Sequence, residues 1–159
     1  MFEFITDAII QAIGNPLLVA LALGFLPVSE VRGAALYAFS IGQPWLIIPG
    51  AIANMLACPV ILLIWDIVNI PFWGRLILGK RLEKKLHDFG RHYEAKGLIA
   101  LTIFMGLPIP MMGVYTGTLI AELIGVKRRH IILSAVAGVT LAAIFLFLFL
   151  GGLKLILGI

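Results

Sequence analysis

An acidic and a basic residue, separated by a single residue, stand in a stretch that is otherwise apolar. Glu30 and Arg32 occur in LPVSEVRGAALYAF, residues 26–39, beside a proline and a glycine. Such a pair could exchange protons or bind an anion. Inside a membrane each charge costs about 2.5–3.5 kcal/mol unless it is paired, hydrated or neutralised, so a functional reason is expected there. The alternative is a surface loop between two membrane spans, with both charges in water.

The composition indicates the class of protein. Of the 159 residues, 62% are hydrophobic and 13% are charged, whereas soluble domains have about 25% charged residues. The sequence therefore predicts an all-α integral membrane protein with a single membrane domain, residues 1–159. Runs without Asp, Glu, Lys or Arg, each long enough for the roughly 20 residues of a span, cover residues 8–29, 33–65, 97–121 and 130–153.

The basic segments predict how the chain is oriented. Lys and Arg are concentrated in residues 74–96 and 127–130. If every apolar run crossed the membrane, these segments would lie on opposite sides, against the tendency of basic loops to remain in the cytoplasm. If residues 97–125 enter and leave from the same side, both segments are cytoplasmic. We therefore expect a re-entrant hairpin between them.

The middle of that run favours a chain reversal. It contains Pro108, Pro110, Gly113 and Gly117, and proline breaks helices while glycine permits sharp turns. Arms of about ten to twelve residues, at about 1.5 Å per residue, reach about half of the hydrocarbon thickness. The tip of the hairpin would then stop near the midplane of the membrane.

The first half of the chain has the same layout around Pro27 and Gly33, with apolar arms from residue 17 to Gly42. Each hairpin is followed by one long apolar segment, residues 44–66 or 130–157. The predicted fold is an inverted repeat of a re-entrant helical hairpin plus a transmembrane helix, an arrangement common among secondary transporters. Repeat 1 covers residues 1–66 and repeat 2 covers residues 97–159.

An interfacial amphipathic helix is expected between the halves, over residues 72–96. Its apolar residues recur at helical spacing, and basic residues cover much of the rest, so it would lie on the cytoplasmic membrane surface. It could bind acidic lipid or only fix the topology. The apolar positions are Leu78, Leu82, Leu86, Phe89 and Tyr93.

The two hairpin tips are expected to meet. Helices beginning at Gly33 and Val114 would direct their positive N-terminal ends at the midplane, and with Arg32 they would make a place for an anion such as phosphate. Glu30 is the candidate for proton coupling, since burial and a neighbouring arginine act on a carboxyl group in opposite directions. Hydroxyl groups are available on Tyr115, Thr116 and Thr118. The candidate site for substrate or protons comprises Pro27, Ser29, Glu30, Arg32, Gly33, Asn54, Pro108, Pro110, Gly113, Tyr115, Thr116 and Gly117.

Other residue patterns point away from enzymes. There is no nucleophile elbow or HExxH motif, and His87 and His92 lack the spacing of a helical metal site, so we expect no catalytic activity, no metal and no cofactor. The single cysteine, Cys58, is interpreted as a packing residue. The net charge of +4 is attributed to membrane orientation rather than to nucleic acid. Glu122 is expected to pair with Arg128 or Lys127, and Asp66 is interpreted as a residue at the membrane surface.

The segments LPVSEVRGAALYA and LPIPMMGVYTGTLIAELIGV resemble the small multidrug export protein family of bacteria and archaea, over nearly the whole chain. That family looks related to the DedA-type membrane proteins, whose fold of two re-entrant hairpins is associated with proton-motive-force-dependent movement of lipids, including polyprenyl phosphates. The DedA pattern has a basic residue in the second hairpin, whereas residues 98–121 are uncharged here, so Arg32 would have to take that role. The family motifs fall on Glu30, Arg32, Pro108, Pro110, Gly113 and Gly117.

We therefore expect a small secondary transporter in the inner (plasma) membrane of a bacterium or archaeon. It would move an anionic or amphipathic substrate such as a lipid phosphate, linked to the proton-motive force. One alternative is a proton-coupled small multidrug exporter, for which Glu30 alone would suffice. Another is a non-transporting membrane scaffold or assembly factor. Expected partners are membrane lipids, the substrate, protons and a second copy of the chain in a homodimer.

Overall fold

The computed structural model describes residues 13–68, 94–107 and 113–157 of the chain. Within these residues the regular elements are all helical, which confirms the predicted all-α class for this part of the chain. They are α2 (Pro16–Phe25), α3 (Glu30–Ser40), the short 3-10 helix η1 (Pro44–Leu46), α4 (Ile47–Val68), α6 (Glu94–Gly106), α7 (Val114–Ile124) and α8 (Arg128–Leu157).

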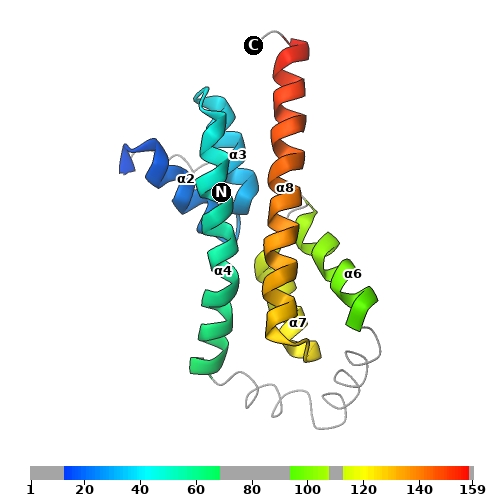
Figure 1. Ribbon diagram of the computed structural model, residues 1–159. Helices are drawn as coiled ribbons and strands as arrows, with labels where there is room; N and C mark the ends of the chain where they lie inside the picture. Colours follow the sequence, from blue (N-terminus) through cyan, green and yellow to red (C-terminus); the bar gives the residue numbers. More distant parts are fainter. Residues whose placement is uncertain (1–12, 69–93, 108–112, 158–159) are drawn as a thin grey trace.

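Two long antiparallel helices, α4 and α8, form the centre of the molecule (Figure 1). Together with η1, α4 gives an apolar segment of 24 residues, and α8 has 30 residues. At about 1.5 Å per residue both exceed the roughly 30 Å of a bilayer's hydrocarbon core. These are the described helices that are long and apolar enough to cross a membrane, and they coincide with the long segments predicted to follow the hairpins.

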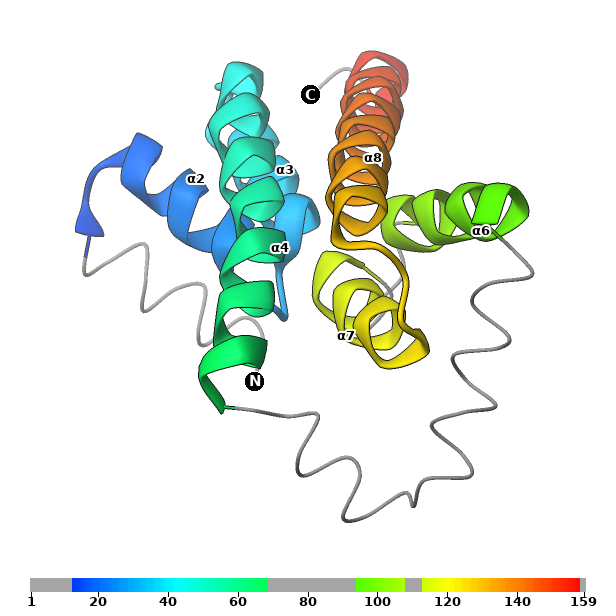
Figure 2. The same cartoon turned by 60° about the horizontal axis from the view of Figure 1, so that its bottom comes forward.

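The shorter helices form two hairpins, which approach the central pair from opposite ends. Hairpin 1 (α2 and α3) turns back near the middle of the molecule, and α3 runs from there to the end at which α4 begins (Figures 1 and 2). In hairpin 2 (α6 and α7), α6 ends and α7 begins near the middle, and α7 runs to the end at which α8 begins. The start of α3 and the start of α7 are therefore brought together between the ends of the long helices.

Local sequence explains where several helices begin and end. The side chain of Asn15 accepts a hydrogen bond from the Leu17 N–H (2.9 Å) and caps α2, with Pro16 at its first position. In hairpin 2, Gly125 follows α7, adopts a left-handed conformation (φ 81°) and ends that helix. Such signals help to set the length of each hairpin arm.

Glycine contacts hold each hairpin against a long helix. A β-carbon on Gly24 of α2 would lie 2.7 Å from the Cα of Gly50 in α4, and one on Gly106 of α6 would lie 2.9 Å from the carbonyl oxygen of Gly138 in α8. The backbones therefore meet directly at both places. Small residues at helix contacts are typical of membrane proteins, where packing rather than water exclusion drives association.

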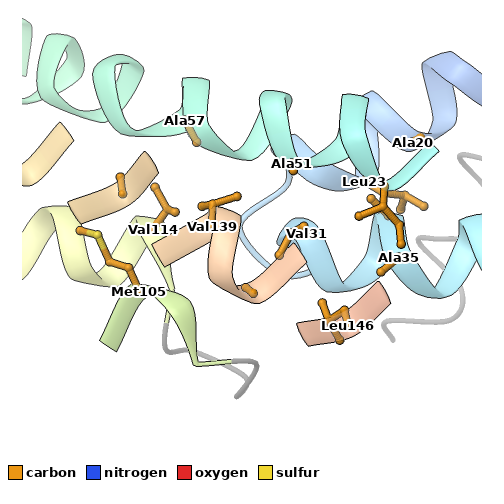
Figure 3. Close-up of a cluster of buried hydrophobic side chains, with 14 of the residues drawn as sticks. Ala20, Leu23, Val31, Ala35, Ala51, Ala57, Met105, Val114, Val139 and Leu146 are labelled. Atoms are coloured by element: carbon orange, nitrogen blue, oxygen red, sulfur yellow. The ribbon is translucent and has the colours of Figure 1, made fainter. Parts of the chain in front are cut away.

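The buried core runs through all of these helices. Figure 3 shows its apolar side chains gathered between α4 and the other helices, with many alanines and valines that permit close approach. Members from the first half are Ala20, Leu23, Val31, Ala35, Ala51 and Ala57, and members from the second half are Met105, Val114, Val139 and Leu146.

The structure bears on some of the sequence predictions and leaves others as they were. Each half contributes two short helices and one long one, as expected, but an inverted repeat with re-entrant hairpins also requires a placement in the membrane and stays a prediction. The amphipathic helix expected over residues 72–96 lies outside the described residues, apart from residues 94–96 at the start of α6.

Candidate functional site

The turn of hairpin 1 positions Glu30 at the start of α3. Helix α2 ends at Phe25 because Leu26 precedes a proline, which disfavours helical backbone, and Leu26 is accordingly extended (φ −71°, ψ 135°). The N–H of Glu30 then donates to the Leu26 carbonyl oxygen (2.9 Å), closing the turn. The expectation that this helix begins at Gly33 is wrong, because the turn is completed earlier and Gly33 already lies inside the first turn of α3.

The backbone of Glu30 has an uncommon conformation. Its φ of 50° lies in the left-handed region, and no other non-glycine residue in the described part of the chain has a positive φ. Such a conformation costs of order 1–3 kcal/mol and persists only where the surroundings fix it. Here it accompanies a buried side chain, since Glu30 is only 6% exposed.

The carboxylate of Glu30 lies against Gly113, the residue that immediately precedes α7 of hairpin 2. A β-carbon on Gly113 would overlap the carboxylate, with its Cδ 2.5 Å away. The contact thus requires glycine at this position. It also brings the start of α3 against the start of α7.

Tyr115, in the first turn of α7, joins the hairpins through two groups. Its backbone N–H donates to the Glu30 carboxylate, and its hydroxyl donates to the carbonyl oxygen of Phe25 at the end of α2. The first bond places a negative charge at the positive end of α7, which is favourable. The second satisfies a terminal carbonyl of α2, a role for the Tyr115 hydroxyl that the sequence analysis did not identify.

Arg32 lies beside Glu30, with spare hydrogen-bonding capacity. Its Nη2 is 3.7 Å from Glu30 Oε2, and the two side chains are 14% and 8% exposed. This separation is longer than a hydrogen bond, so the pair is held by charge alone. Nη1 of Arg32 is buried without a hydrogen-bond partner among the described residues. A guanidinium in this state has donors directed into the protein that a ligand could use.

The remaining predicted residues of hairpin 1 make local contacts. The hydroxyl of Ser29 donates to the Leu23 carbonyl oxygen (2.5 Å) and is buried. The position of a side chain on Gly33 is already filled by Ser29. Pro27 is exposed in the turn. These residues therefore shape the turn that carries Glu30, rather than presenting free groups of their own.

The other predicted site residues of hairpin 2 that the structure describes lie either in a helix contact or near the start of α7. A β-carbon on Gly117 would lie 2.6 Å from Met105 Cγ, so Gly117 permits α7 to pack on α6. Thr116 is partly buried and borders the turn. Pro108 and Pro110 lie outside the described residues.

Two further polar side chains are buried, one on α4 and one on α7. Asn54 of α4 and Thr118 of α7 are 1% and 0% exposed, and Asn54 Oδ1 and Thr118 Oγ1 both lack a hydrogen-bond partner within the described residues. Thr118 lies beside the thiol of Cys58, one turn after Asn54 on α4. Asn54 was among the predicted site residues, and Thr118 was considered only as a source of a hydroxyl.

An ion cluster joins α4, α7 and α8 at the end where α7 finishes. Arg128 donates to both oxygens of Asp66 (2.7 and 2.6 Å), and its Nε and Nη2 donate to Glu122 Oε1 (3.0 and 2.8 Å). The predicted pairing of Glu122 with Arg128 is thus confirmed. The bidentate contact with Asp66 adds a third helix that the sequence did not connect to it.

The arrangement at the hairpin turns has the chemistry of an anion site. A buried carboxylate occupies the end of a helix whose N–H groups favour negative charge, and an arginine with an unpaired donor stands next to it. A carboxylate in this position could bind and release a proton. The residues that converge here are Glu30, Arg32, Gly113 and Tyr115.

Comparison with known proteins gives one match. No curated protein and no solved structure matches the chain. The model of a protein family matches residues 30–145, which begin at Glu30, the first residue of α3, include α4, α6 and α7, and end within α8. Because this range covers well over half of the 159 residues, the chain belongs to the family described as "Putative small multi-drug export protein".

Proposed function

We propose that this membrane protein is a small secondary transporter that moves an anionic or amphipathic substrate, such as a lipid phosphate, and couples the movement to protons. The observation that carries the proposal is the position of the Glu30 carboxylate. It accepts the Tyr115 N–H at the start of α7 and lies beside the Arg32 guanidinium. Helix N-termini and arginine are groups that bind phosphate and carboxylate anions. Membership of a family of export proteins supports a transport role.

Glu30 holds the place that a substrate anion would take. When it is ionised, its carboxylate competes with the substrate for Tyr115 and for Arg32. When it is protonated, the competing charge is removed, and the buried Nη1 of Arg32 is available to a ligand. Proton binding and anion binding then favour one another, and the effect is reciprocal by linkage. This is the coupling that a proton-linked transporter needs.

The arrangement of the hairpins supports this role. Hairpin 1 and hairpin 2 approach α4 and α8 from opposite ends, and α3 and α7 begin next to one another (Figure 1). In our proposal both hairpins are re-entrant, the two halves form an inverted repeat, and α4 and α8 cross the plasma membrane. Discontinuous helices with N-termini directed at an anionic group near the midplane are found in secondary transporters.

Reconstitution tests this function. The purified protein is placed in vesicles, and the movement of a fluorescent anionic phospholipid and of a polyprenyl phosphate between leaflets is followed with and without a pH gradient. We expect movement above that in empty vesicles, with dependence on the gradient that disappears in Glu30→Gln. Arg32→Gln should abolish movement, whereas Lys154→Gln, at an exposed cation near the end of α8, should not. No movement of any anionic lipid would contradict the proposal.

Export of cationic drugs is the second candidate, favoured by the description of the family. Glu30 alone would suffice for it, because a buried carboxylate can bind either a proton or a cation. Expression would then confer drug resistance that vanishes in Glu30→Gln and survives in Arg32→Gln. The Arg32→Gln variant thus separates the two functions, since the anionic substrate requires the guanidinium.

The transporter is proposed to act as a homodimer. One chain supplies two candidate spans among its described helices, which is little material to enclose a pathway for a substrate. Size measurement in mild detergent and in nanodiscs is the direct check. A uniform monomer in both would contradict the proposal.

A further inference from the structure

Very close helix contacts hold together each half of the molecule. In half 1 (α2, α3, η1 and α4), Gly50 of α4 is approached by Gly24 of α2 and by Ala34 of α3, and there is no room for a side chain on either glycine. In half 2 (α6, α7 and α8), Gly138 of α8 is approached in the same way by Gly106 of α6. Helices packed at this density transmit a displacement to one another, so each half can move as one body.

Side chains join the two halves. At the anion site in the middle of the molecule, the Glu30 carboxylate of half 1 accepts the Tyr115 N–H of half 2. Further along the interface, the thiol of Cys58 on α4 lies beside Thr118 on α7. Side chains change rotamer rapidly, so contacts of this kind can break and re-form while the packing within each half stays intact.

An ion pair closes the interface at the end where α4 finishes. Both carboxylate oxygens of Asp66 on α4 accept hydrogen bonds from Arg128 on α8 (2.7 and 2.6 Å). The two side chains are 53% and 45% exposed, and exposed ion pairs exchange readily with hydration. Glu122 lies in the same half as Arg128 and accepts two further hydrogen bonds from it (3.0 and 2.8 Å). Asp66 can therefore leave for water when the halves part, while Glu122 keeps Arg128 in place.

An aromatic pair closes the interface at the opposite end, where α4 begins. The rings of Phe39, in the last turn of α3, and Phe147, on α8, meet edge to face with their centroids 6.1 Å apart. The Phe39 ring also lies near Gly151 of α8, where an added β-carbon would be 3.8 Å away, an ordinary van der Waals distance. This contact is looser than the glycine contacts within each half, so the rings can separate from one another without a clash.

We propose that these two contacts are gates, which open alternately as half 1 rocks against half 2. The ionic gate (Asp66 and Arg128) controls access to the anion site from one end of the molecule, and the aromatic gate (Phe39 and Phe147) controls access from the other. Because the halves stay in contact at Glu30 in the middle, parting at one end presses them together at the other. The inference rests on the proposed function, since the gates serve the anion site. It adds the residues that control access to that site.

Distances between spin labels test the gates without a transport measurement. The full chain in nanodiscs, in a Cys58→Ala background, carries one pair of labels at Ile67 of α4 and Leu133 of α8, toward the ionic gate. A second pair is placed at Ile48 of α4 and Leu155 of α8, toward the aromatic gate. All four labelled side chains are exposed, so the labels leave the packing undisturbed. Pulsed electron paramagnetic resonance gives the distribution of distances for each pair.

Removing the ionic gate should open that end alone. Asp66→Asn eliminates the ion pair between the halves, whereas Glu122 still binds Arg128. The population with longer distances at the ionic end should therefore increase several-fold, and the pair at the aromatic end should not lengthen. Asp66→Glu keeps the charge and should resemble the parent. Arg129→Gln, at an exposed cation beside Arg128, is the matched control and should change neither pair.

Removing the aromatic gate should open the opposite end alone. Phe147→Ala deletes one ring of the pair, so the labels at the aromatic end should separate while those at the ionic end do not. Phe149→Ala is the matched control. Its ring is 56% exposed and stacks on Phe145 of the same helix, with centroids 5.9 Å apart, so its removal should leave both distances unchanged.

The distances distinguish gates from contacts that only hold the fold together. Parent-like distances in both Asp66→Asn and Phe147→Ala would overturn the proposal, even if the protein moved anionic lipid. Lengthening of both pairs in either variant would also overturn it, because the helices would then be loosened rather than alternating. Separate opening of the two ends in a protein that moves no anionic lipid would support the gates and contradict the proposed function.

Discussion

The carboxylate of Glu30, at the start of α3, lies directly against Gly113, at the start of α7. This contact joins two hairpins that are far apart in the sequence. It depends on the absence of a side chain at position 113 and on the left-handed backbone of Glu30. The two residues therefore fix how the start of α3 lies against the start of α7.

Gly113→Ala should disrupt this junction. The new β-carbon would overlap the Glu30 carboxylate, and overpacking of this kind costs about 1–3 kcal/mol. We expect a lower unfolding temperature in detergent and a loss of transport. The same substitution in a Glu30→Gly background should be nearly neutral, because no carboxylate remains to be displaced. An equal loss of stability in both backgrounds would show that Gly113 acts through something other than Glu30.

The glycine contacts between each hairpin and its long helix should be sensitive to a single methyl group. In Gly24→Ala and in Gly106→Ala the added carbon meets backbone atoms of Gly50 and of Gly138, which cannot rotate away. We expect each to reduce stability by about 1–3 kcal/mol. Thermal unfolding in detergent measures the change.

Gly152→Ala is the control for this pair, since a β-carbon there would meet nothing within 4 Å. Because alanine favours helix over glycine by about 0.5–1 kcal/mol, this variant should be unchanged or slightly more stable. If all three variants were equally stable, the close approach of α2 to α4 and of α6 to α8 would be wrong.

The ion cluster leads us to expect a larger loss of stability from replacing Arg128 than from replacing Asp66. Arg128→Gln removes a partner of both Asp66 and Glu122, including two hydrogen bonds to the Glu122 carboxylate, whose side chain is 13% exposed. Asp66→Asn removes only an exposed partner. Arg128→Gln should therefore lower the unfolding temperature more, and the difference should shrink at high salt, which screens exposed charges. Arg129→Gln is the matched control, and an effect as large as that of Arg128→Gln would contradict the assigned role of the cluster.

The sequence predicted much of the framework but little of the site's detail. Charge-free runs and the Pro- and Gly-containing segments located the long helices and the hairpins, because these signals are local. The start of α7 at Val114 followed from Gly113, whereas α3 was expected at Gly33 and begins at Glu30. The error arose because glycine was taken as a helix start, although the turn after Pro27 is closed by the Glu30 N–H itself.

The sequence could not show which residues of different helices contact one another. That Glu30 meets Tyr115, and that Arg128 binds Asp66 as well as Glu122, depends on how deep each helix lies relative to the others. Asn54 and Thr118 were two polar residues in apolar runs, which are equally compatible with a bond to a neighbouring helix. Only the structure shows that, among the described residues, their side-chain oxygens lack a hydrogen-bond partner.

The placement of hairpin 1 in the membrane can be tested at Val28, in its turn. Val28 is 63% exposed on the protein itself, so burial by other residues would not prevent its labelling.

In a Cys58→Ala background, cysteines are introduced singly at Val28, Gln43 and Arg129 and treated with an impermeant thiol reagent in intact cells and in inverted vesicles. If the hairpin is re-entrant from outside, position 43 is labelled in cells and position 129 only in inverted vesicles. Position 28 should react weakly in both, because the lipid or a narrow cavity surrounds it. Rapid labelling of position 28 in cells would make the turn an exposed loop, and Glu30 and Arg32 would then lie in water instead of at an intramembrane site.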